Sequence, residues 1–428
     1  MNTLKKCLTI TLLLLLAITG AVRLVQAEEK VVITMTGSTV GKEGDLIRKG
    51  ADLYMQAHPN VDIRIMEVPD STTARLMLYL KKMTAQSPEI DLYQIDVIWT
   101  GELADHLVDL QQYGAGTIPA LHFPALIQNN TVNGRLIAMP WFTDAGLLYY
   151  RTDLLAKYGF SGPPATWDEL EKMAKTIQDG EVREGKENFW GYVWQGDIYE
   201  GLLCNALEWS VSHGGGTLIN QRRQVTVNTP EFIAALERTK NWIGTITPPA
   251  VTGFLEDDAR RWWQGGNAAF MRNWPYVYAM ANADDSPVKG KFAVAPLPGL
   301  APGTGAATLG GWQLAVSKYS KRPDVAADIA LFMTSQEMQK MRAIEGSYNP
   351  TIPSLYQDPD ILKAAPFFGE LYDVFTNAVA RPSSQTAPKY SAASQLVFTA
   401  VHEILTGQKR VQDGVEALQA DLEDLLAK

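Results

Sequence analysis

The amino-acid sequence predicts an α/β protein with two lobes, and two observations carry this prediction. Over residues 30–99, segments with a strand-like pattern alternate with segments of helical spacing, in the order strand, helix, strand, helix, strand. This order is typical of a parallel sheet with helices on its faces. The chain has 428 residues, more than one ordinary hydrophobic core holds, so a second lobe is expected.

The first lobe is expected to begin with three strands and two helices. The predicted strands are residues 30–36, 61–68 and 91–99, and the predicted helices are residues 41–57 and 71–86. In such sheets ligands bind beyond the carboxyl ends of the strands. Polar residues at or just past these ends, or on the helices that follow, are therefore candidates for a binding site: Glu43, Arg75 and Asp96.

The region after residue 140 predicts further strands and helices. Residues 145–150 form a near-continuous apolar run, as in a strand buried on both faces. Thr166 and Glu169 have the spacing of a capping box at the start of a helix. A second helix start is predicted at Thr229, which is followed by Pro230 at the first helical position.

Three later patterns complete the expected elements. Residues 266–276 predict a strand that leads to a pair of aromatic residues, and residues 313–320 predict a strand followed by a helix over residues 322–335. From about residue 392 the chain predicts two amphipathic helices. We interpret these two helices as a solvated cap and assign them no partner helix.

The first 27 residues predict a secretory signal. Lys5 and Lys6 precede an apolar stretch, residues 8–18, that is too short to anchor in a bilayer, and the sequence VQA before Glu28 fits a cleavage site. Cys7 comes before the apolar stretch, so it cannot be the lipid-bearing first residue of a mature lipoprotein. We expect a soluble protein that is exported to the periplasm and cleaved near Ala27.

The charge of the chain argues against nucleic acid and membrane surfaces as partners. Removal of residues 1–27 takes away three cations and no acid, so the formal net charge changes from −9 to −12. An acidic chain without a basic run is a poor candidate for such partners. Cys204 is then the one cysteine left, which excludes an intrachain disulfide.

The motifs of common catalytic and cofactor sites are missing from the sequence. The five histidines are scattered without metal-ligand spacing, and neither a G-x-S-x-G elbow nor a phosphate-binding loop occurs. We therefore expect no metal, no cofactor and no catalysis. A glycosidase stays open as an alternative, because the separation of carboxylate pairs among 47 acidic residues cannot be read from the sequence.

Several aromatic residues stand beside polar and turn residues rather than inside periodic segments. Pyranose rings have apolar C–H faces that pack on flat aromatic side chains, and their hydroxyls pair with carboxylates and guanidinium groups. Each aromatic alone fits core packing equally well, but the polar neighbours favour a sugar site. The residues concerned are Trp141, Phe142, Trp194, Trp274, Tyr276 and Trp312.

The stretch ATLGGWQLAV, residues 307–316, places two glycines directly before a tryptophan. Such a pair marks either a turn into a strand with a core tryptophan, or a place where a ligand approaches the backbone closely. Both interpretations stay open at this point.

Four longer stretches resemble one family of proteins. Residues 140–159, 189–204, 262–299 and 306–320 are similar to the trehalose/maltose-binding proteins, which are extracellular solute-binding proteins of ABC sugar importers. The resemblance extends, with gaps, over essentially the whole mature chain. It implies the periplasmic-binding-protein fold, in which two α/β lobes joined by a hinge close over one sugar in a central cleft and then dock on the membrane permease.

The resemblance also implies where the lobes begin and end. The N-terminal lobe comprises residues 28–143 and 312–349, and the C-terminal lobe comprises residues 144–311 and 350–428. The implied hinge crossings fall near Thr143, Gly311 and Asn349.

Carried over position by position, the resemblance implies a set of sugar contacts. The carboxylates would accept sugar hydroxyls, the aromatic rings would stack on the sugar, and the two glycines would present backbone groups. The implied contacts are Glu43, Arg75 and Asp96 from the first lobe, Asp144 at the first crossing, Trp274, Tyr276 and Arg381 from the second lobe, and Gly310, Gly311 and Trp312 at the hinge.

Two positions depart from the family pattern. The relatives have a tyrosine where Phe142 stands, so a hydroxyl contact is missing there. The segment after Arg381 is longer than the family pattern, and Tyr390 is matched to a family tyrosine only across that longer segment. Both departures bear on which sugar is bound rather than on the class of protein.

The expected function is that of a non-catalytic, monomeric periplasmic binding protein that delivers a disaccharide, trehalose or maltose, to the permease of an ABC importer. The alternatives are a binding protein for another α-glucoside such as sucrose or a maltodextrin, a binding protein that reports to a chemoreceptor, and a secreted glycosidase.

Overall fold

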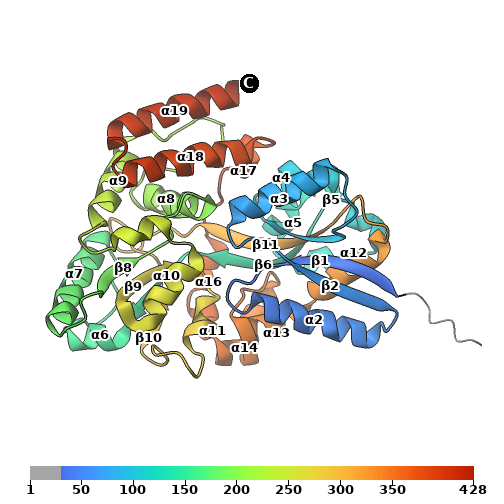
Figure 1. Cartoon of the computed structure of the whole chain (residues 1–428), viewed down its shortest axis with the longest axis horizontal. Helices are drawn as coiled ribbons and strands as arrows, with labels where there is room; N and C mark the ends of the chain where they lie inside the picture. Colours follow the sequence, from blue (N-terminus) through green and yellow to red (C-terminus); the bar gives the residue numbers. More distant parts are fainter. Residues whose placement is uncertain (1–29) are drawn as a thin grey trace, which may run out of the picture.

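The protein consists of two α/β lobes, each built around its own β-sheet (Figure 1). The computed structural model describes residues 30–428, so the predicted export signal lies outside the described residues. Strands β6 and β11 lie at the centre of the molecule, between the helices of one lobe and those of the other (Figure 1).

The first-lobe sheet has five strands, and its first three confirm the parallel arrangement predicted over residues 30–99. Both β2 and β3 run parallel to β1, whereas β11 runs antiparallel to β3 and β6. The complete sheet is therefore mixed, because β11 returns to it from the other lobe rather than through a helical crossover. The strand order is β2 (Val61–Glu67), β1 (Val31–Gly37), β3 (Leu92–Asp96), β11 (Leu309–Val316) and β6 (Met139–Ala145).

Helices cover both faces of this sheet. Alternate residues of a strand point to opposite faces, so each strand contributes to two cores. Ile33 and Met35 of β1 belong to the core that also contains the buried residues of α2. Tyr93 and Ile95 of β3 belong to a second core that contains the buried residues of α3. The helices of this lobe are α2 (Glu43–Ala57), α3 (Thr72–Thr84), α4 (Thr100–Leu103), α5 (Pro124–Asn129), α12 (Pro323–Met333) and α13 (Gln336–Gly346), and a small hairpin joins β4 (Thr131–Val132) to β5 (Arg135–Leu136).

The second-lobe sheet has four strands in the order β10 (Phe292–Ala295), β7 (Leu147–Arg151), β9 (Ala268–Asn273) and β8 (Trp190–Val193). β7 runs antiparallel to both of its neighbours, and β8 runs parallel to β9. The α-helices of this part of the chain are α6 (Thr152–Lys157), α7 (Trp167–Arg183), α8 (Glu200–Ser212), α9 (Pro230–Trp242), α10 (Glu256–Trp262), α11 (Val277–Ala281), α14 (Pro359–Ala364), α15 (Phe367–Glu370), α16 (Tyr372–Thr376), α17 (Ser383–Thr386), α18 (Tyr390–Leu405) and α19 (Val411–Ala427). Short 3-10 turns lie at Ala104–His106, Leu110–Tyr113, Ile118–Leu121, Pro249–Gly253 and Pro353–Gln357, and a π-helical turn lies at Trp263–Asn267.

The predicted helix starts are confirmed atom by atom. The Thr166 hydroxyl accepts a hydrogen bond from the backbone N–H of Glu169, and the Glu169 carboxylate accepts one from the N–H of Thr166. The Thr229 hydroxyl caps α9 by accepting from the N–H of Phe232, without a reciprocal bond, and Pro230 stands at the first position. These motifs need only residues close in sequence, which is why the sequence alone predicts them.

Two predicted strands have different bounds from those expected. The strand expected over residues 313–320 begins earlier, at Leu309, so Gly310 and Gly311 lie inside β11 rather than in front of it. The strand expected over residues 91–99 ends at Asp96, because the N–H of Trp99 donates to the Asp96 carbonyl and closes a turn there.

The prediction of a solvated C-terminal cap is wrong for α18. This helix packs against α8, α9 and α19, and its apolar residues Val397, Val401 and Ile404 are buried. The amphipathic pattern that suggested a cap marks a helix whose apolar stripe completes the core of the second lobe.

The three predicted hinge crossings lie side by side. Thr143 pairs with Gly311 between β6 and β11, and its N–H donates to the Asn349 carbonyl at 3.1 Å. The three predicted crossing residues therefore meet at one place, where β6 pairs with β11 on one side and with the segment at Asn349 on the other. Within residues 30–428, no helix combines the length and apolar character needed to span a bilayer.

Candidate functional site

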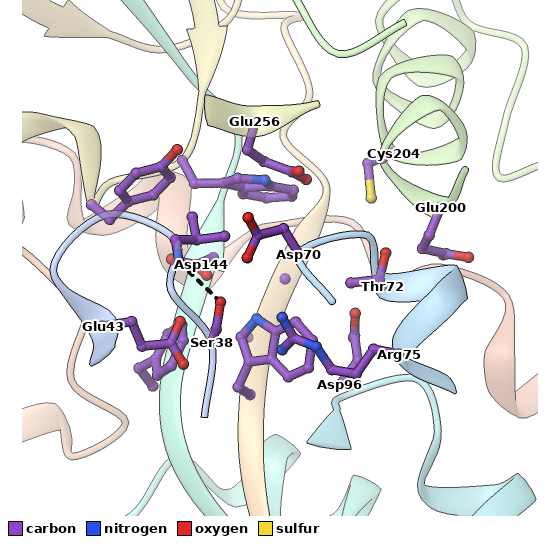
Figure 2. Close-up of a pocket in the computed structure, with 18 of the residues that line it drawn as sticks. Ser38, Glu43, Asp70, Thr72, Arg75, Asp96, Asp144, Glu200, Cys204 and Glu256 are labelled. Atoms are coloured by element: carbon purple, nitrogen blue, oxygen red, sulfur yellow. Dashed lines mark hydrogen bonds between the residues drawn. The ribbon is translucent and has the colours of Figure 1, made fainter. Parts of the chain in front are cut away.

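A cleft between the two lobes collects polar and aromatic side chains from both (Figure 2). The first lobe supplies lining residues from the loops after β1 and β2, the starts of α2 and α3, the end of β3 and the turn after α13. The others come from the β6–β11 crossing, from α8 and α10, and from the segments after β9 and before α17. The lining residues are Ser38, Val40, Glu43, Asp70, Thr72, Arg75, Asp96, Phe142, Asp144, Glu200, Gly201, Cys204, Glu256, Trp274, Tyr276, Gly310, Gly311, Trp312, Tyr348 and Arg381.

The structure brings the predicted sugar contacts together. Every residue of the main predicted set lines this cleft, and Phe142 lines it as well. Tyr390 does not line it. The hydroxyl of Tyr390 instead donates to the Glu200 carboxylate at 2.5 Å, behind the cleft wall.

Glu43 enters the cleft as the first residue of α2. Its side chain is buried, and it accepts a hydrogen bond from the amide of Gln94 on the neighbouring strand β3. Burial raises the pKa of the Glu43 carboxyl above its usual range, while the guanidinium groups of Arg342 and Arg75 act in the opposite direction.

Arg75, on α3, also lines the cleft from the first lobe. Its guanidinium carbon lies 4.3 Å from the centroid of the Trp312 ring, and its Nε donates to the Pro69 carbonyl at 3.0 Å. The buried Nη1 has no hydrogen-bond partner among residues 30–428. A fixed guanidinium with a free N–H group is suited to donate to an acceptor on a ligand.

Arg381 joins the two lobes across the cleft. One nitrogen, Nη2, lies 2.7 Å from Asp96 of the first-lobe strand β3, and Nη1 lies 3.0 Å from Glu200 at the start of α8 in the second lobe. All three side chains are buried. Tyr390 and Ser394 of α18 also donate to Glu200, so Arg381 is attached to the second lobe through a hydrogen-bonded network.

Further contacts join the lobes beside this ion pair. The backbone N–H of Glu200 donates to the Thr73 hydroxyl of α3 at 3.2 Å, and the Ser391 hydroxyl of α18 donates to Glu102 of α4 at 2.6 Å. The two lobes therefore touch across the cleft, and the structure shows it closed.

Trp274 forms the aromatic wall of the second lobe. Its ring lies 3.9 Å from the guanidinium carbon of Arg272, which is held by a buried bidentate pair with Glu208. The neighbouring Tyr276 donates its hydroxyl to Asp257 at 2.8 Å. Both rings are thus fixed by charged partners behind them rather than by apolar packing alone.

The two glycines allow close approach of protein groups. A Cβ atom on Gly310 would lie 3.1 Å from the Trp274 ring, and one on Gly311 would lie 2.6 Å from the Phe142 carbonyl oxygen. Gly311 also has a φ of +130°, which side-chain-bearing residues rarely adopt. The glycines therefore let β6 and the Trp274 ring pack against β11, and both also face the cleft.

Asp144 stands at the crossing, among other charged groups. Burial raises the pKa of the Asp144 carboxyl well above its ordinary value, and the carboxylates of Glu43 and Asp96 raise it further. Arg272 and Arg342 act in the opposite direction. The closed cleft thus concentrates acids that are desolvated and close to one another, and such groups need donors from a ligand or from nearby cations.

Some lining residues were not among the sequence predictions. Ser38 follows β1 and Asp70 follows β2, so the rule that selected Asp96 after β3 would have found both. Glu200 and Cys204 lie within the stretch of residues 189–204 that carries the resemblance, but no local pattern marks them as lining residues. Tyr348 enters the cleft only through tertiary packing, so the sequence offers no signal for it.

Two α/β lobes that close around a polar and aromatic cleft define a protein that encloses a small solute. The sequence matches the family of bacterial extracellular solute-binding proteins over residues 38–340. A probable ABC transporter-binding protein of Deinococcus radiodurans is 48% identical over 407 residues, covering 95% of this chain and 96% of the relative. This chain therefore belongs to the bacterial extracellular solute-binding protein family.

Solved structures of other proteins agree with this assignment. The maltose-bound MalE3 of T. maritima is 42% identical and has a TM-score of 0.87, with 92% of this chain and 100% of that chain covered. A D-mannitol-bound ABC transporter solute-binding protein of Agrobacterium vitis has a TM-score of 0.80 at 20% identity, with 92% and 98% covered, and supports the fold alone. The protein is a solute-binding component of an ABC transporter, and membership of an extracellular family places it outside the cytoplasm.

Proposed function

We propose that this protein binds a disaccharide, trehalose or maltose, in the closed cleft and presents it to the permease of an ABC importer in the periplasm. The observation that carries the proposal is the composition of the cleft, in which flat aromatic rings alternate with carboxylates and guanidinium groups drawn from both lobes. The maltose found in the T. maritima protein, at 42% identity, supports a sugar of this size.

The proposed contacts divide by chemistry. Trp274 and Trp312 offer flat faces to the apolar sides of the pyranose rings. The carboxylates of Glu43, Asp96 and Asp144 accept hydrogen bonds from hydroxyls, and the guanidinium groups of Arg75 and Arg381 donate hydrogen bonds to hydroxyl oxygens. Tyr276, Gly310 and Gly311 complete the proposed set.

The proposed movement is a rotation of one lobe against the other about the three crossings. The moving units are residues 28–143 with 312–349 and residues 144–311 with 350–428. A ligand drives closure only by binding the closed state more tightly than the open one. Here that difference comes from contacts with residues of both lobes, such as Asp96 and Arg381, which one bound sugar meets together only in the closed form.

We propose no catalysis in this cleft and a monomeric protein. A glycosidase remains the alternative from another class, because the cleft contains several carboxylates and a pair of them could flank one glycosidic bond. Recovery of the sugar after binding separates the two functions, since a binding protein returns it uncleaved. Another α-glucoside such as sucrose or a maltodextrin is the alternative within the class, and Phe142 is one position where the choice would be made.

Calorimetric titration of the mature protein with trehalose, maltose, sucrose and maltotriose tests the proposal. The protein is first unfolded and refolded, which removes any sugar carried from the cell. One-to-one binding of trehalose or maltose, with intact sugar recovered by chromatography, is the expected result. Hydrolysis would favour the glycosidase, and absence of binding across the panel would overturn the disaccharide while leaving the family assignment in place.

A further inference from the structure

A buried cation stands directly behind one wall of the cleft. Arg342 of α13 is 3% exposed, and its guanidinium carbon lies 4.0 Å from the centroid of the Trp141 ring, 4.6 Å from that of Tyr348 and 5.0 Å from that of Phe142. Phe142 and Tyr348 line the cleft, whereas Arg342 does not. The arginine therefore contacts the back of the wall whose front faces the ligand.

Within the part of the chain that the structure describes, Arg342 has neither an ion pair nor a hydrogen-bond partner for its guanidinium group. The three nitrogens of the Arg342 guanidinium are buried and lack a hydrogen-bond partner among residues 30–428. Arg381 and Arg272 differ in this respect, since Arg381 pairs with two carboxylates and Arg272 pairs with Glu208. Among the described residues Arg75 has no carboxylate partner either, but its Nε donates to the Pro69 carbonyl. A guanidinium group stays charged in a protein, and an unpaired buried charge is costly.

The aromatic rings alone do not account for an arginine at this position. Stacking on three rings contributes a favourable cation–π interaction. An apolar side chain of similar length would fill the same space without the cost of burying a charge. The charge itself therefore calls for an explanation beyond packing.

Two acids of the same cleft supply that explanation. Asp144 lies on β6 with Trp141 and Phe142, whose rings contact Arg342. Glu43 begins α2, beside the Val40 carbonyl that accepts from the Tyr348 hydroxyl. Arg342 favours the ionised form of both Glu43 and Asp144, and each of these acids is otherwise pushed toward its neutral form by burial. Neither acid has an ion pair within residues 30–428. Arg342 is the cation that acts on both of them, alongside Arg75 on Glu43 and Arg272 on Asp144.

Other charged groups also raise or lower the pKa of Glu43 and Asp144. Arg75 favours and Asp70 opposes ionisation of Glu43, which also accepts the amide hydrogen bond of Gln94. Arg272 favours ionisation of Asp144, and Asp96 and Glu43 oppose it. The groups facing Arg342 itself are Glu43, Asp144 and the Tyr348 hydroxyl.

We propose that Arg342 is a positioning residue of the binding cleft. Its unpaired charge favours the carboxylate forms of Glu43 and Asp144, which accept hydrogen bonds from the hydroxyls of the ligand, while its planar face fixes the Phe142 and Tyr348 wall. This inference rests on the proposed binding of a polyhydroxylated ligand and adds a residue that does not touch that ligand.

Two substitutions separate the charge from the shape. Arg342→Met keeps the length of the side chain and removes the charge, whereas Arg342→Lys keeps the charge and loses the planar stacking. For Arg342→Met, the dissociation constant of the bound sugar should rise about tenfold more than in the wild type between pH 8 and pH 5.5, since a shift of about one pKa unit in a cleft acid changes its protonation tenfold. Arg342→Lys should lower the affinity by a similar factor at every pH and keep the wild-type pH profile.

A measurement without ligand keeps the inference testable if no sugar of the panel binds. Loss of the cation makes the two buried carboxylates more costly when ionised. The unfolding midpoint of Arg342→Met, relative to the wild type, should therefore fall as the pH rises from 5 to 8, and addition of Glu43→Gln should remove part of that slope. Arg342→Lys is the control, because its unfolding midpoint should differ from that of the wild type by the same amount at every pH.

Equal, pH-independent losses in both Arg342 variants would overturn the inference and assign Arg342 to packing alone. Failure of the wild type to bind any sugar would instead overturn the proposed function, and the slope of the unfolding midpoint would still decide whether Arg342 holds the acids ionised.

Discussion

Trp312 is held between a cation and a second indole ring. The Arg75 guanidinium carbon lies 4.3 Å from the centroid of the Trp312 ring, and Trp99 meets the same ring edge-on with the centroids 5.5 Å apart. The ring is therefore fixed in place before any ligand arrives. A flat surface that is already ordered binds a sugar face without the loss of side-chain entropy that a mobile ring would suffer.

Replacement of Trp312 by alanine should weaken sugar binding. Loss of a buried aromatic contact is expected to cost about 1–3 kcal/mol of binding free energy, measured by calorimetric titration of the refolded protein. Trp262→Ala is the matched control, because Trp262 is also partly buried but lies outside the cleft. Equal affinity of Trp312→Ala and the wild type would contradict the stacking role.

The strand β11 shows how an element can depend on two glycines. Gly311 occupies a left-handed conformation opposite Thr143, where β6 and β11 pair at the predicted crossing between the lobes. A Cβ there would lie 2.6 Å from the Phe142 carbonyl and 2.9 Å from the Thr143 Cα. Backbone atoms of β6 cannot move aside without disturbing the crossing itself.

Gly311→Ala should therefore destabilise the protein. A strained conformation of this kind costs about 1–3 kcal/mol, and the contact with β6 adds to it. Urea unfolding monitored by tryptophan fluorescence measures the change. Gly162→Ala serves as control, because nothing lies within 4 Å of a Cβ at that position and its φ is ordinary. Unchanged stability of Gly311→Ala would show that the crossing tolerates displacement.

The contrast between elements explains which parts of the fold the sequence predicts. The capping box at Thr166 and Glu169 is complete within four residues, so local spacing predicts it correctly. β11 was expected to start at Gln313, since two glycines disfavour a strand locally. Pairing with β3 and β6 overrides that preference, and no local pattern encodes pairing between residues as far apart as Asp96 and Trp312.

The same contrast holds for the cleft. Glu43, Arg75 and Asp96 follow from the rule that ligands bind beyond the carboxyl ends of parallel strands. In the second lobe, Trp274 was a candidate because of its polar and turn neighbours, whereas Arg381 was predicted only through the family resemblance. Arg342 and Tyr348 escaped prediction altogether, because a helix residue such as Arg342 that packs behind a wall looks like any other charged helix residue in sequence, and Tyr348 enters the cleft only from the turn after α13.

At the scale of the whole molecule, the buried acids of the cleft should make its closure depend on pH. Burial in this closed form raises the pKa of Glu43, Asp144, Glu200 and Glu256 above their ordinary values. A group whose pKa is higher in one conformation binds protons more tightly there, so protons favour that conformation. The ligand-free protein should therefore shift toward the closed form as the pH falls toward the ordinary carboxyl range, and away from it as the pH rises.

Small-angle X-ray scattering measures this shift directly. The radius of gyration of the ligand-free protein should be smaller at pH 5 than at pH 8, and sugar should reduce it at both values. Asp144→Asn removes one buried charge and should make the ligand-free protein more compact at pH 8. A radius that does not depend on pH would mean that the cleft acids do not oppose closure.

The order in which β11 joins its sheet has a consequence for how the chain is made. This strand lies between β3 and β6, yet the ribosome delivers it only after all four strands of the second-lobe sheet. The first lobe thus cannot complete its sheet until most of the polypeptide exists, and pairings of such long range are slow to form. Delayed folding of this kind suits an exported protein. The first-lobe sheet is still incomplete during most of synthesis, and an unfolded chain is easier to translocate.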